Sequence, residues 1–136
     1  MADVNTIMYV VTRNPIPPGQ LTIYKVLYDA GDDWISQQEL AADATGGNVV
    51  ALNGALRGLA NRVHQTSAEL KEAHQGYELM IEKVERDGQW FYRMTPALRS
   101  VIESLPQLHE AMKLSVEDIR TKFEKMSSWL VIDSAG

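Results

Sequence analysis

The side chains best suited to recognising a ligand lie on one stretch of the chain, Asn48–Thr66. Its apolar residues recur at helical spacing, which places one stripe of a helix against a core: Leu52, Leu56, Leu59 and Val63. At about 100° per residue, a second set points the opposite way and carries little bulk: Val50, Gly54, Arg57 and Asn61. An arginine there can donate to base edges or phosphates, and the alternative is an ordinary solvated helix face.

Five polar residues of this stretch are predicted to form a nucleic-acid contact surface, with Arg57 as the leading candidate. The full set is Asn48, Asn53, Arg57, Asn61 and Arg62. Two glycines, Gly54 and Gly58, also fall within the helix, where each costs about 1 kcal/mol relative to alanine. We therefore expect something to approach this helix closely, either a nucleic-acid groove or another protein helix.

A hairpin is predicted over Gly76–Met94. Apolar and polar residues alternate along it, and Asp87-Gly88 is a strong two-residue turn. Folding about this turn sets Glu82 opposite Arg93, which partly neutralises Arg93, and leaves Arg86 at the tip as the predicted phosphate contact. One face is predicted to face the core: Tyr77, Leu79, Ile81, Trp90, Tyr92 and Met94. Trp90 and Phe91 are alternatively an exposed aromatic contact near the tip.

Several elements precede the central helix. Val4–Thr12 is rich in β-branched residues and is predicted to be a strand, followed by a stiff proline-rich linker. Gln20–Ala30 has helical spacing and ends at Gly31. A short strand is expected before Ser36, and Ser36 with Glu39 forms a capping box for a helix that ends at the Gly46-Gly47 turn.

Helices are predicted beyond the hairpin. Thr95-Pro96 is a typical helix start, and Ser115 caps a further helix. The last helix carries a narrow apolar seam that we expect to form a homodimer interface: Val116, Ile119, Phe123, Met126 and Leu130. In the competing arrangement this helix folds back onto Gln20–Ala30 and the N-terminal strand.

Other classes of chemistry find little support in the sequence. Cysteine is absent, and the three histidines, His64, His74 and His109, do not form a metal-binding pattern. No metalloprotease motif, nucleophile elbow or glycine-rich phosphate loop occurs, so we predict neither an enzyme nor a bound cofactor or metal.

Composition bounds the class of protein. The 136 residues fit one domain, with 45% hydrophobic and 23% charged residues. No signal-peptide pattern or membrane-spanning apolar run is present, so a cytoplasmic protein without a membrane partner is expected. The net charge of −5 opposes phosphate binding, since Lys and Arg supply much of the affinity for DNA.

The order of these elements resembles the winged-helix superfamily over about Gly19–Ser104. The hairpin end, WFYRMTPALRSVI, is similar to the strand, threonine and helix ending of many bacterial winged-helix regulators. The resemblance implies an α+β winged helix-turn-helix fold over residues 19–104. An N-terminal strand and linker (1–18) would precede it, and a C-terminal helical extension (105–136) would follow.

The resemblance also implies a function. The central helix would read double-stranded DNA with the hairpin as wing, most plausibly in transcriptional regulation by a homodimer. Winged helices also serve as protein-interaction modules, so the alternative is a non-enzymatic module that binds a protein partner and no DNA. Basic charge on the outer helix face and at the wing tip distinguishes the two.

Overall fold

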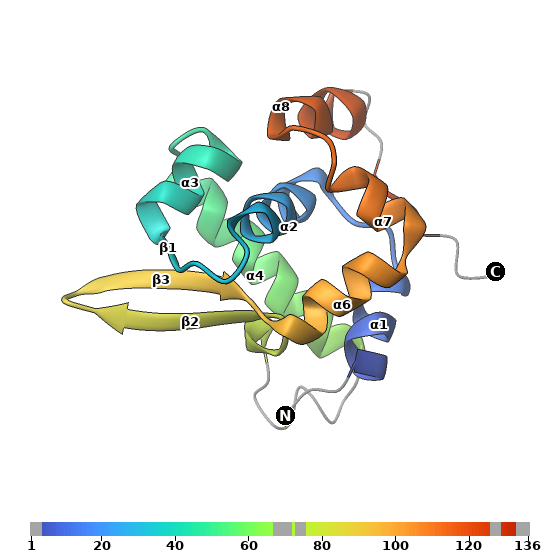
Figure 1. The fold of residues 1–136 in the computed structure, drawn as a ribbon, viewed down its shortest axis with the longest axis horizontal. Coiled ribbons are helices and arrows are strands. Elements are labelled where there is room, and N and C mark those ends of the chain that lie inside the picture. Colours follow the sequence, from blue (N-terminus) through green and yellow to red (C-terminus); the bar gives the residue numbers. More distant parts are fainter. Residues whose placement is uncertain (1–3, 67–71, 73–75, 126–128, 133–136) are drawn as a thin grey trace.

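The computed structural model, which describes residues 4–66, 72, 76–125 and 129–132, consists of helices with a small antiparallel sheet at one side (Figure 1). The fold is mixed α+β, and the order of its elements is compatible with the expected winged-helix arrangement. The helices are α1 (Val4–Thr12), α2 (Pro18–Ala30), α3 (Gln37–Thr45), α4 (Val49–Thr66), α6 (Pro96–Ser104), α7 (Pro106–Ala111) and α8 (Val116–Ile119). The shorter elements are the 3-10 turn η1 (Tyr77–Leu79), the π-helical turn η2 (Arg120–Glu124), and the strands β1 (Ile35–Ser36), β2 (Ile81–Arg86) and β3 (Gln89–Met94).

The sheet has the order β1-β3-β2, and all its pairs are antiparallel. The hairpin register is the predicted one, with Arg86 opposite Gln89 and Glu82 opposite Arg93. Asp87 (φ 52°) and Gly88 (φ 78°) both have positive φ, as a tight turn that follows the twist of the strands requires. The β2–β3 hairpin projects away from the helices in Figure 1.

Part of the predicted core face of the hairpin is wrong. Ile81, Tyr92 and Met94 are buried, as expected. Tyr77 and Leu79 are half-buried and pack against the core, but they lie in η1 and not in the strand, because the chain enters the sheet only after them. Trp90 is 38% exposed, since the outer half of the hairpin extends beyond the helices that cover its base.

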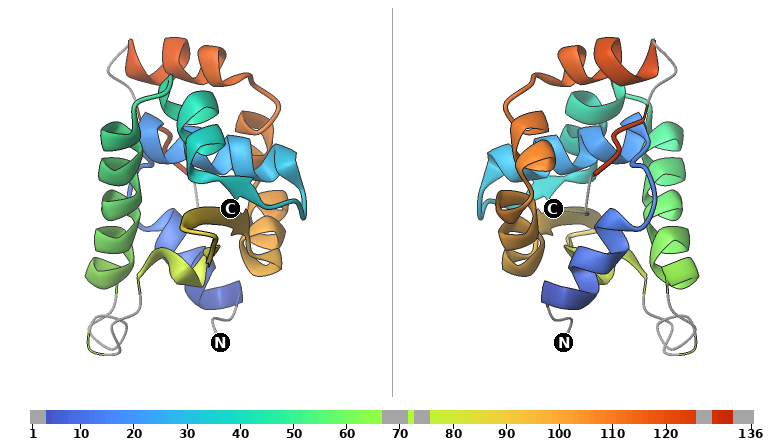
Figure 2. Two further views of the ribbon diagram at one scale, coloured as in Figure 1. Left: turned by 90° about the vertical axis from the view of Figure 1, so that its left-hand side faces the viewer. Right: turned by 90° about the vertical axis from the view of Figure 1, so that its right-hand side faces the viewer.

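The N-terminal segment, predicted as a strand, is the helix α1. Ile7, Val10 and Val11 are fully buried, and their spacing of three and four residues matches one helix face. α1 packs against α6 and α4, so tertiary packing overrides the strand preference of its β-branched residues (Figure 2).

The predicted cap of α3 is confirmed, and α4 has a side-chain cap as well. The backbone N–H of Glu39 donates to Ser36 Oγ at 3.1 Å and begins α3, and Gly46 (φ 65°) ends α3 in the left-handed conformation. Asn48 Oδ1 accepts from the backbone N–H of Ala51 at 3.0 Å and begins α4. α3 and α4 thus form two packed helices joined by a short glycine turn.

The expected dimerisation seam lies largely inside its own protomer. Ile119 (0% exposed) and Phe123 (5% exposed) are buried, and α8 and η2 pack on α2. In both views of Figure 2 this segment lies over α2. Val116 is half-buried, and Leu130 pairs with Ile16 through two backbone hydrogen bonds of 2.8 and 3.0 Å. Met126 lies outside the described residues. The helix therefore folds back onto α2, and the seam provides no argument for a homodimer.

Candidate nucleic-acid interface

The outer face of α4 is the largest part of the predicted contact surface that is available to a partner. Asn53, Arg57 and Asn61 are exposed on it, at successive intervals of four residues. Val50, one turn before Gly54, is 81% exposed. The opposite stripe is buried as predicted: Leu52, Leu56, Leu59 and Val63.

Two asparagines of the predicted set hold local structure with their carbonyl oxygens. Asn48 Oδ1 caps α4, and Asn53 Oδ1 accepts from Gln37 Nε2 at 3.3 Å, which ties the start of α3 to α4. Both residues are exposed, and their side-chain amide nitrogens still provide donors.

Arg57 is the cation best placed for recognition. Its side chain is exposed, and among the described residues it makes neither a hydrogen bond nor an ion pair. A guanidinium has five N–H donors in a planar fork, which suits a guanine edge or a phosphate. Arg57 thus offers all of them to a ligand.

Arg62 is not part of this surface. It is 6% exposed, and its guanidinium donates to four backbone carbonyls at and just beyond the C-terminal end of α1. The acceptors are the carbonyl oxygens of Val10 (2.8 Å), Val11 (3.0 Å), Asn14 and Pro15 (3.0 Å). Burial lowers the pKa of the Arg62 guanidinium, but these partners satisfy its donors. The prediction of a DNA contact by Arg62 is therefore wrong: it joins α4 to α1.

The wing carries cations stacked on aromatic rings. Arg93 forms the expected pair with Glu82 (Nη2–Oε2 2.6 Å), and its guanidinium lies 4.2 Å from the centre of the Trp34 ring. The Arg86 guanidinium lies 5.7 Å from the same ring, and Lys83 Nζ lies 5.1 Å from the Trp90 ring. Arg86 remains exposed near the tip, so it is the wing cation that can reach a phosphate.

The wing tip and the start of α3 lie close to each other. Gly88, Gln89 and Trp90 line one side of a small hollow of about 130 Å³, and Ser36–Gln38 line the other. Because Gln37 also bonds to Asn53, the wing tip, α3 and α4 are linked along one side of the molecule. The amides of Gln37 and Gln38 were missed from the sequence, since nothing in it places the wing tip beside them.

Basic side chains elsewhere occupy the C-terminal ends of helices, where carbonyl oxygens lack partners and the helix dipole is negative. Arg99 donates to the carbonyls of Tyr28 (3.1 Å) and Gly31 (3.3 Å) at the end of α2. Arg120 donates to the Ala44 carbonyl of α3, and Lys25 to the Met112 carbonyl after α7 (2.6 Å). With Arg62, these residues place four cations away from the outer face of α4 and the wing tip, and sequence spacing did not predict it.

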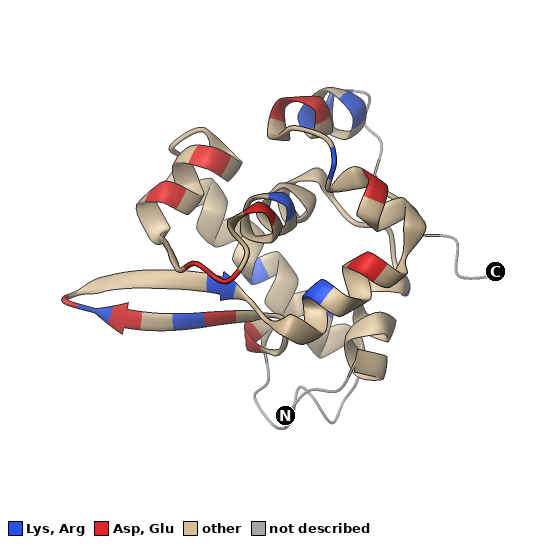
Figure 3. Ribbon diagram, in the orientation of Figure 1, with Lys and Arg blue, Asp and Glu red and all other residues tan. Residues whose placement is uncertain are grey.

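The candidate surface carries acidic residues beside its basic ones, so it is not a basic patch. Figure 3 shows acidic and basic residues alternating along β2, with acidic residues on α3. Within the described part of the chain, no group of three or more His, Asp or Glu side chains is placed to hold a metal ion. No described helix has the length and apolar character needed to span a membrane.

Comparison with known proteins gives no match: neither a family model, nor a curated protein, nor a solved structure matches this chain. The functional argument therefore depends on the element order and on the chemistry of this surface.

Proposed function

We propose that this chain is a winged-helix protein that binds double-stranded DNA, with α4 as the reading helix and the β2–β3 hairpin as the wing. A cytoplasmic transcriptional regulator fits this proposal. Its support is the order α2, β1, α3, α4, β2, β3 together with the sheet order β1-β3-β2. This arrangement leaves the outer face of α4 uncovered next to the wing.

The observation that carries the proposal is the outer face of α4. Arg57 is exposed and without a partner among the described residues, and Asn53 and Asn61 lie one turn to either side. Arginine suits guanine, asparagine suits adenine, and an apolar group such as Val50 suits the thymine methyl. Arg57, with no partner among the described residues, is the base-reading side chain on which the proposal chiefly depends, because Asn53 already accepts from Gln37 with its Oδ1.

The electrostatics set the expected strength of binding. Arg57 and Arg86 are the two cations of the candidate surface, in a chain with a net charge of −5. The slope of log K against log salt is about −1 for one phosphate contact, by Arg86, and about −2 if Arg57 neutralises a second phosphate. Binding should therefore be modest and depend only weakly on salt.

A titration of mixed-sequence duplex DNA between 50 and 200 mM salt tests the proposal. We expect binding at low salt with the shallow slope given above, and a loss of most affinity in the double variant Arg57→Ala, Arg86→Ala. The matched control is Lys122→Ala with Lys125→Ala, which removes two exposed cations from η2 and the residue after it.

Absence of binding at 50 mM salt, or equal losses in both double variants, would overturn the proposal. The second candidate would then be a non-enzymatic module that binds a protein. The acidic net charge and the four basic side chains held at helix ends favour that candidate.

A further inference from the structure

A pocket of about 730 Å³ opens beside α4, on the side away from the wing-facing donors considered above. Its walls come from the start of α2, the end of α3, the first half of α4, and η2 with Trp129. The residues that line it are Pro17, Pro18, Gly19, Thr22, Ala44, Thr45, Ala51, Ala55, Arg120, Phe123 and Trp129.

The walls are mostly apolar and partly aromatic. Phe123, in η2, is 5% exposed, whereas Trp129 is 55% exposed. Ala51 and Ala55 are small, which leaves room along α4. A half-exposed tryptophan at the edge of an apolar hollow provides a surface on which a flat ring can stack.

Among the described residues that line the pocket, Arg120 is the one charged side chain, and none of them is a carboxylate. The bond to the Ala44 carbonyl fixes the guanidinium at the end of α3, where its Nη1 also lies 3.9 Å from the position of a Cβ on Gly46. One such bond leaves other donors of the guanidinium for a ligand.

The two hydroxyls of the lining donate to the protein. Thr22 Oγ1 donates to the Gly19 carbonyl at 3.0 Å, and Thr45 Oγ1 lies 2.9 Å from the Ala41 carbonyl. Both oxygens can then only accept from a ligand, so the donors left among the described lining side chains are the Arg120 guanidinium, which is charged, and the neutral indole N–H of Trp129. The pocket thus combines apolar walls with a single positive charge.

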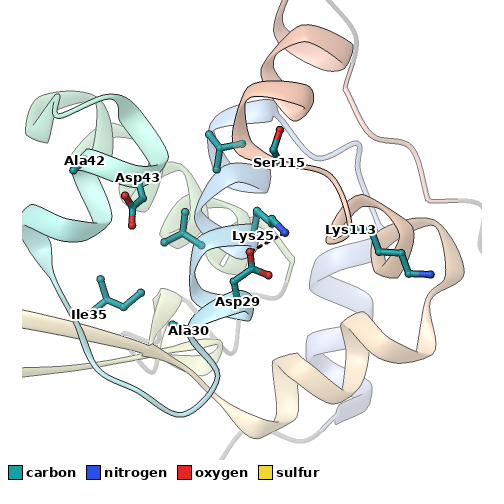
Figure 4. A pocket seen from close by; sticks show the side chains of 10 residues that line it. Lys25, Asp29, Ala30, Ile35, Ala42, Asp43, Lys113 and Ser115 are labelled. Atoms are coloured by element: carbon teal, nitrogen blue, oxygen red, sulfur yellow. Dashed lines mark ion pairs between the residues drawn. The ribbon is translucent and has the colours of Figure 1, made fainter.

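The neighbouring pocket, of about 790 Å³, has a different character (Figure 4). Its Lys25 is already paired with Asp29 at 2.8 Å and bonded to the Met112 carbonyl, and Lys113 pairs with Glu110 at 2.9 Å. Asp43 adds another carboxylate to its lining. Its charges oppose one another, so it favours neither sign of ligand, in contrast to the pocket at Arg120.

We propose that the Arg120 pocket binds a small aromatic monocarboxylate. The ring lies between Trp129, Phe123 and the alanines of α4, and the carboxylate accepts from the Arg120 guanidinium. A charge-assisted bond to a guanidinium is stronger than one between neutral groups, and the apolar walls favour the aromatic ring. This site goes beyond the proposed DNA binding and does not depend on it.

Three probes of equal ring size and different head charge test the site: 2-naphthoate, 2-naphthamide and 2-naphthylmethylamine. Isothermal titration calorimetry with the full chain should show 2-naphthoate binding at least ten-fold tighter than either of the others. Equal affinity for all three, or no saturable binding of 2-naphthoate, would overturn the proposal.

Two pairs of variants locate the site. Ala51→Leu fills the pocket and should abolish binding of 2-naphthoate. Val50→Leu, at the preceding residue and outside the lining, should not change it. Arg120→Gln should remove the preference for 2-naphthoate over 2-naphthamide, whereas Lys122→Gln, two residues further on, should keep it.

The ratio of the affinities for 2-naphthoate and 2-naphthamide distinguishes loss of the charge from a general weakening of the pocket. Arg120 also bonds the end of α3, so its loss can weaken the pocket as a whole. Such weakening lowers the affinity for both probes and leaves their ratio unchanged. A preserved ratio in Arg120→Gln, or unchanged binding in Ala51→Leu, would contradict the site.

Discussion

Arg57 and Arg62 lie five residues apart on α4 and have opposite surroundings. Arg57 is exposed and has no partner among the described residues, whereas Arg62 is 6% exposed and bonded to four backbone carbonyls. Five residues correspond to about 140° around a helix, so the two side chains leave it in different directions. One arginine is available to a ligand, and the other is part of the fold.

The difference shows that the number of Lys and Arg residues on a helix overestimates how many of them can contact phosphates. Arg62 lies next to the stripe of Leu59 and Val63, at the edge of the core, and it reaches the end of α1. A carbonyl that has lost its helical partner attracts a guanidinium strongly because the alternative is an unsatisfied buried acceptor. The availability of a charge thus depends on which helix ends lie near it.

The largest expected effect separates the two arginines by stability. Arg62→Ala removes a guanidinium from four carbonyls and should lower the free energy of unfolding by about 3 kcal/mol or more, since hydrogen bonds to charged groups are worth about 1.5–3 kcal/mol each and do not add fully. Arg57→Ala should change it by less than about 0.5 kcal/mol. Urea denaturation of both variants measures the difference.

Arg62→Lys sharpens this test. Lysine keeps the charge but lacks the planar fork, so it should recover only part of the lost stability. If Arg62→Ala were as mild as Arg57→Ala, the link between α4 and the end of α1 would be refuted.

A second test concerns Tyr24, a buried side chain whose pKa the Arg62 charge affects. Tyr24 is fully buried, and burial raises the pKa of its phenol to about 12, against a smaller opposite effect of the Arg62 charge. Because the folded pKa lies above the unfolded value of about 10, the folded state holds its proton more tightly. This contribution is complete below pH 10 and is lost as the pH rises towards 12.

Between pH 9 and pH 11.5 the free energy of unfolding should therefore fall by about 2 kcal/mol less in Tyr24→Phe than in the wild type. At neutral pH the variant should be nearly as stable, since the hydroxyl makes only a 3.9 Å contact with Met80 Sδ. Tyr9→Phe, at a residue that is 59% exposed, is the control and should follow the wild type. Parallel pH curves for Tyr24→Phe and wild type would show that Tyr24 titrates as if exposed.

Much of the fold was predictable because its signals are local. The hairpin register followed from the Asp87-Gly88 turn, and the start of α3 followed from the spacing of Ser36 and Glu39. The buried stripe of α4 followed from its period. In each of these, residues close in sequence determine the geometry.

The errors involve residues far apart in sequence. The β-branched residues of Val4–Thr12 predict a strand, but the segment forms the helix α1, which packs against α6. That error hid the role of Arg62, since only a helix presents free carbonyls at its C-terminal end. The seam of Ile119 and Phe123 was assigned to a second copy because the sequence does not show that α2 lies beneath it. The Arg120 pocket likewise collects residues from 17 to 129 and has no sequence signature.

Arg57 on α4 and Arg86 on the wing are both exposed, and they should differ in what they recognise on DNA. On a duplex selected from a random pool, Arg57→Ala should weaken binding about ten-fold or more, since a good base contact is worth about 1–3 kcal/mol. Arg86→Ala should weaken binding to selected and random duplexes by the same smaller factor, because a phosphate contact carries no sequence information. Fluorescence anisotropy with both duplexes measures the two ratios. Equal ratios for both variants would remove α4 from the role of reading helix.

The smallest expected effect compares two glycines of α4. An added Cβ on Gly54 meets no atom within 4 Å, so Gly54→Ala should stabilise the protein by about 0.5–1 kcal/mol through the reduced freedom of the unfolded chain. On Gly58 the same Cβ lies 3.1 Å from Nε2 of Gln20, which is itself 8% exposed. Gly58→Ala should therefore gain less than Gly54→Ala, because the buried Gln20 side chain must shift.

The two variants also distinguish the faces of α4. Gly58 is explained by the close approach of α2 inside the protein, whereas Gly54 has no such neighbour among the described residues. If α4 lies deep in a DNA groove, Gly54→Ala should raise the thermal midpoint and still weaken DNA binding. Gly58→Ala should leave DNA binding unchanged, because its Cβ points towards Gln20. A Gly54→Ala protein that gains stability and keeps its full affinity for DNA would show that the groove does not come close to this face.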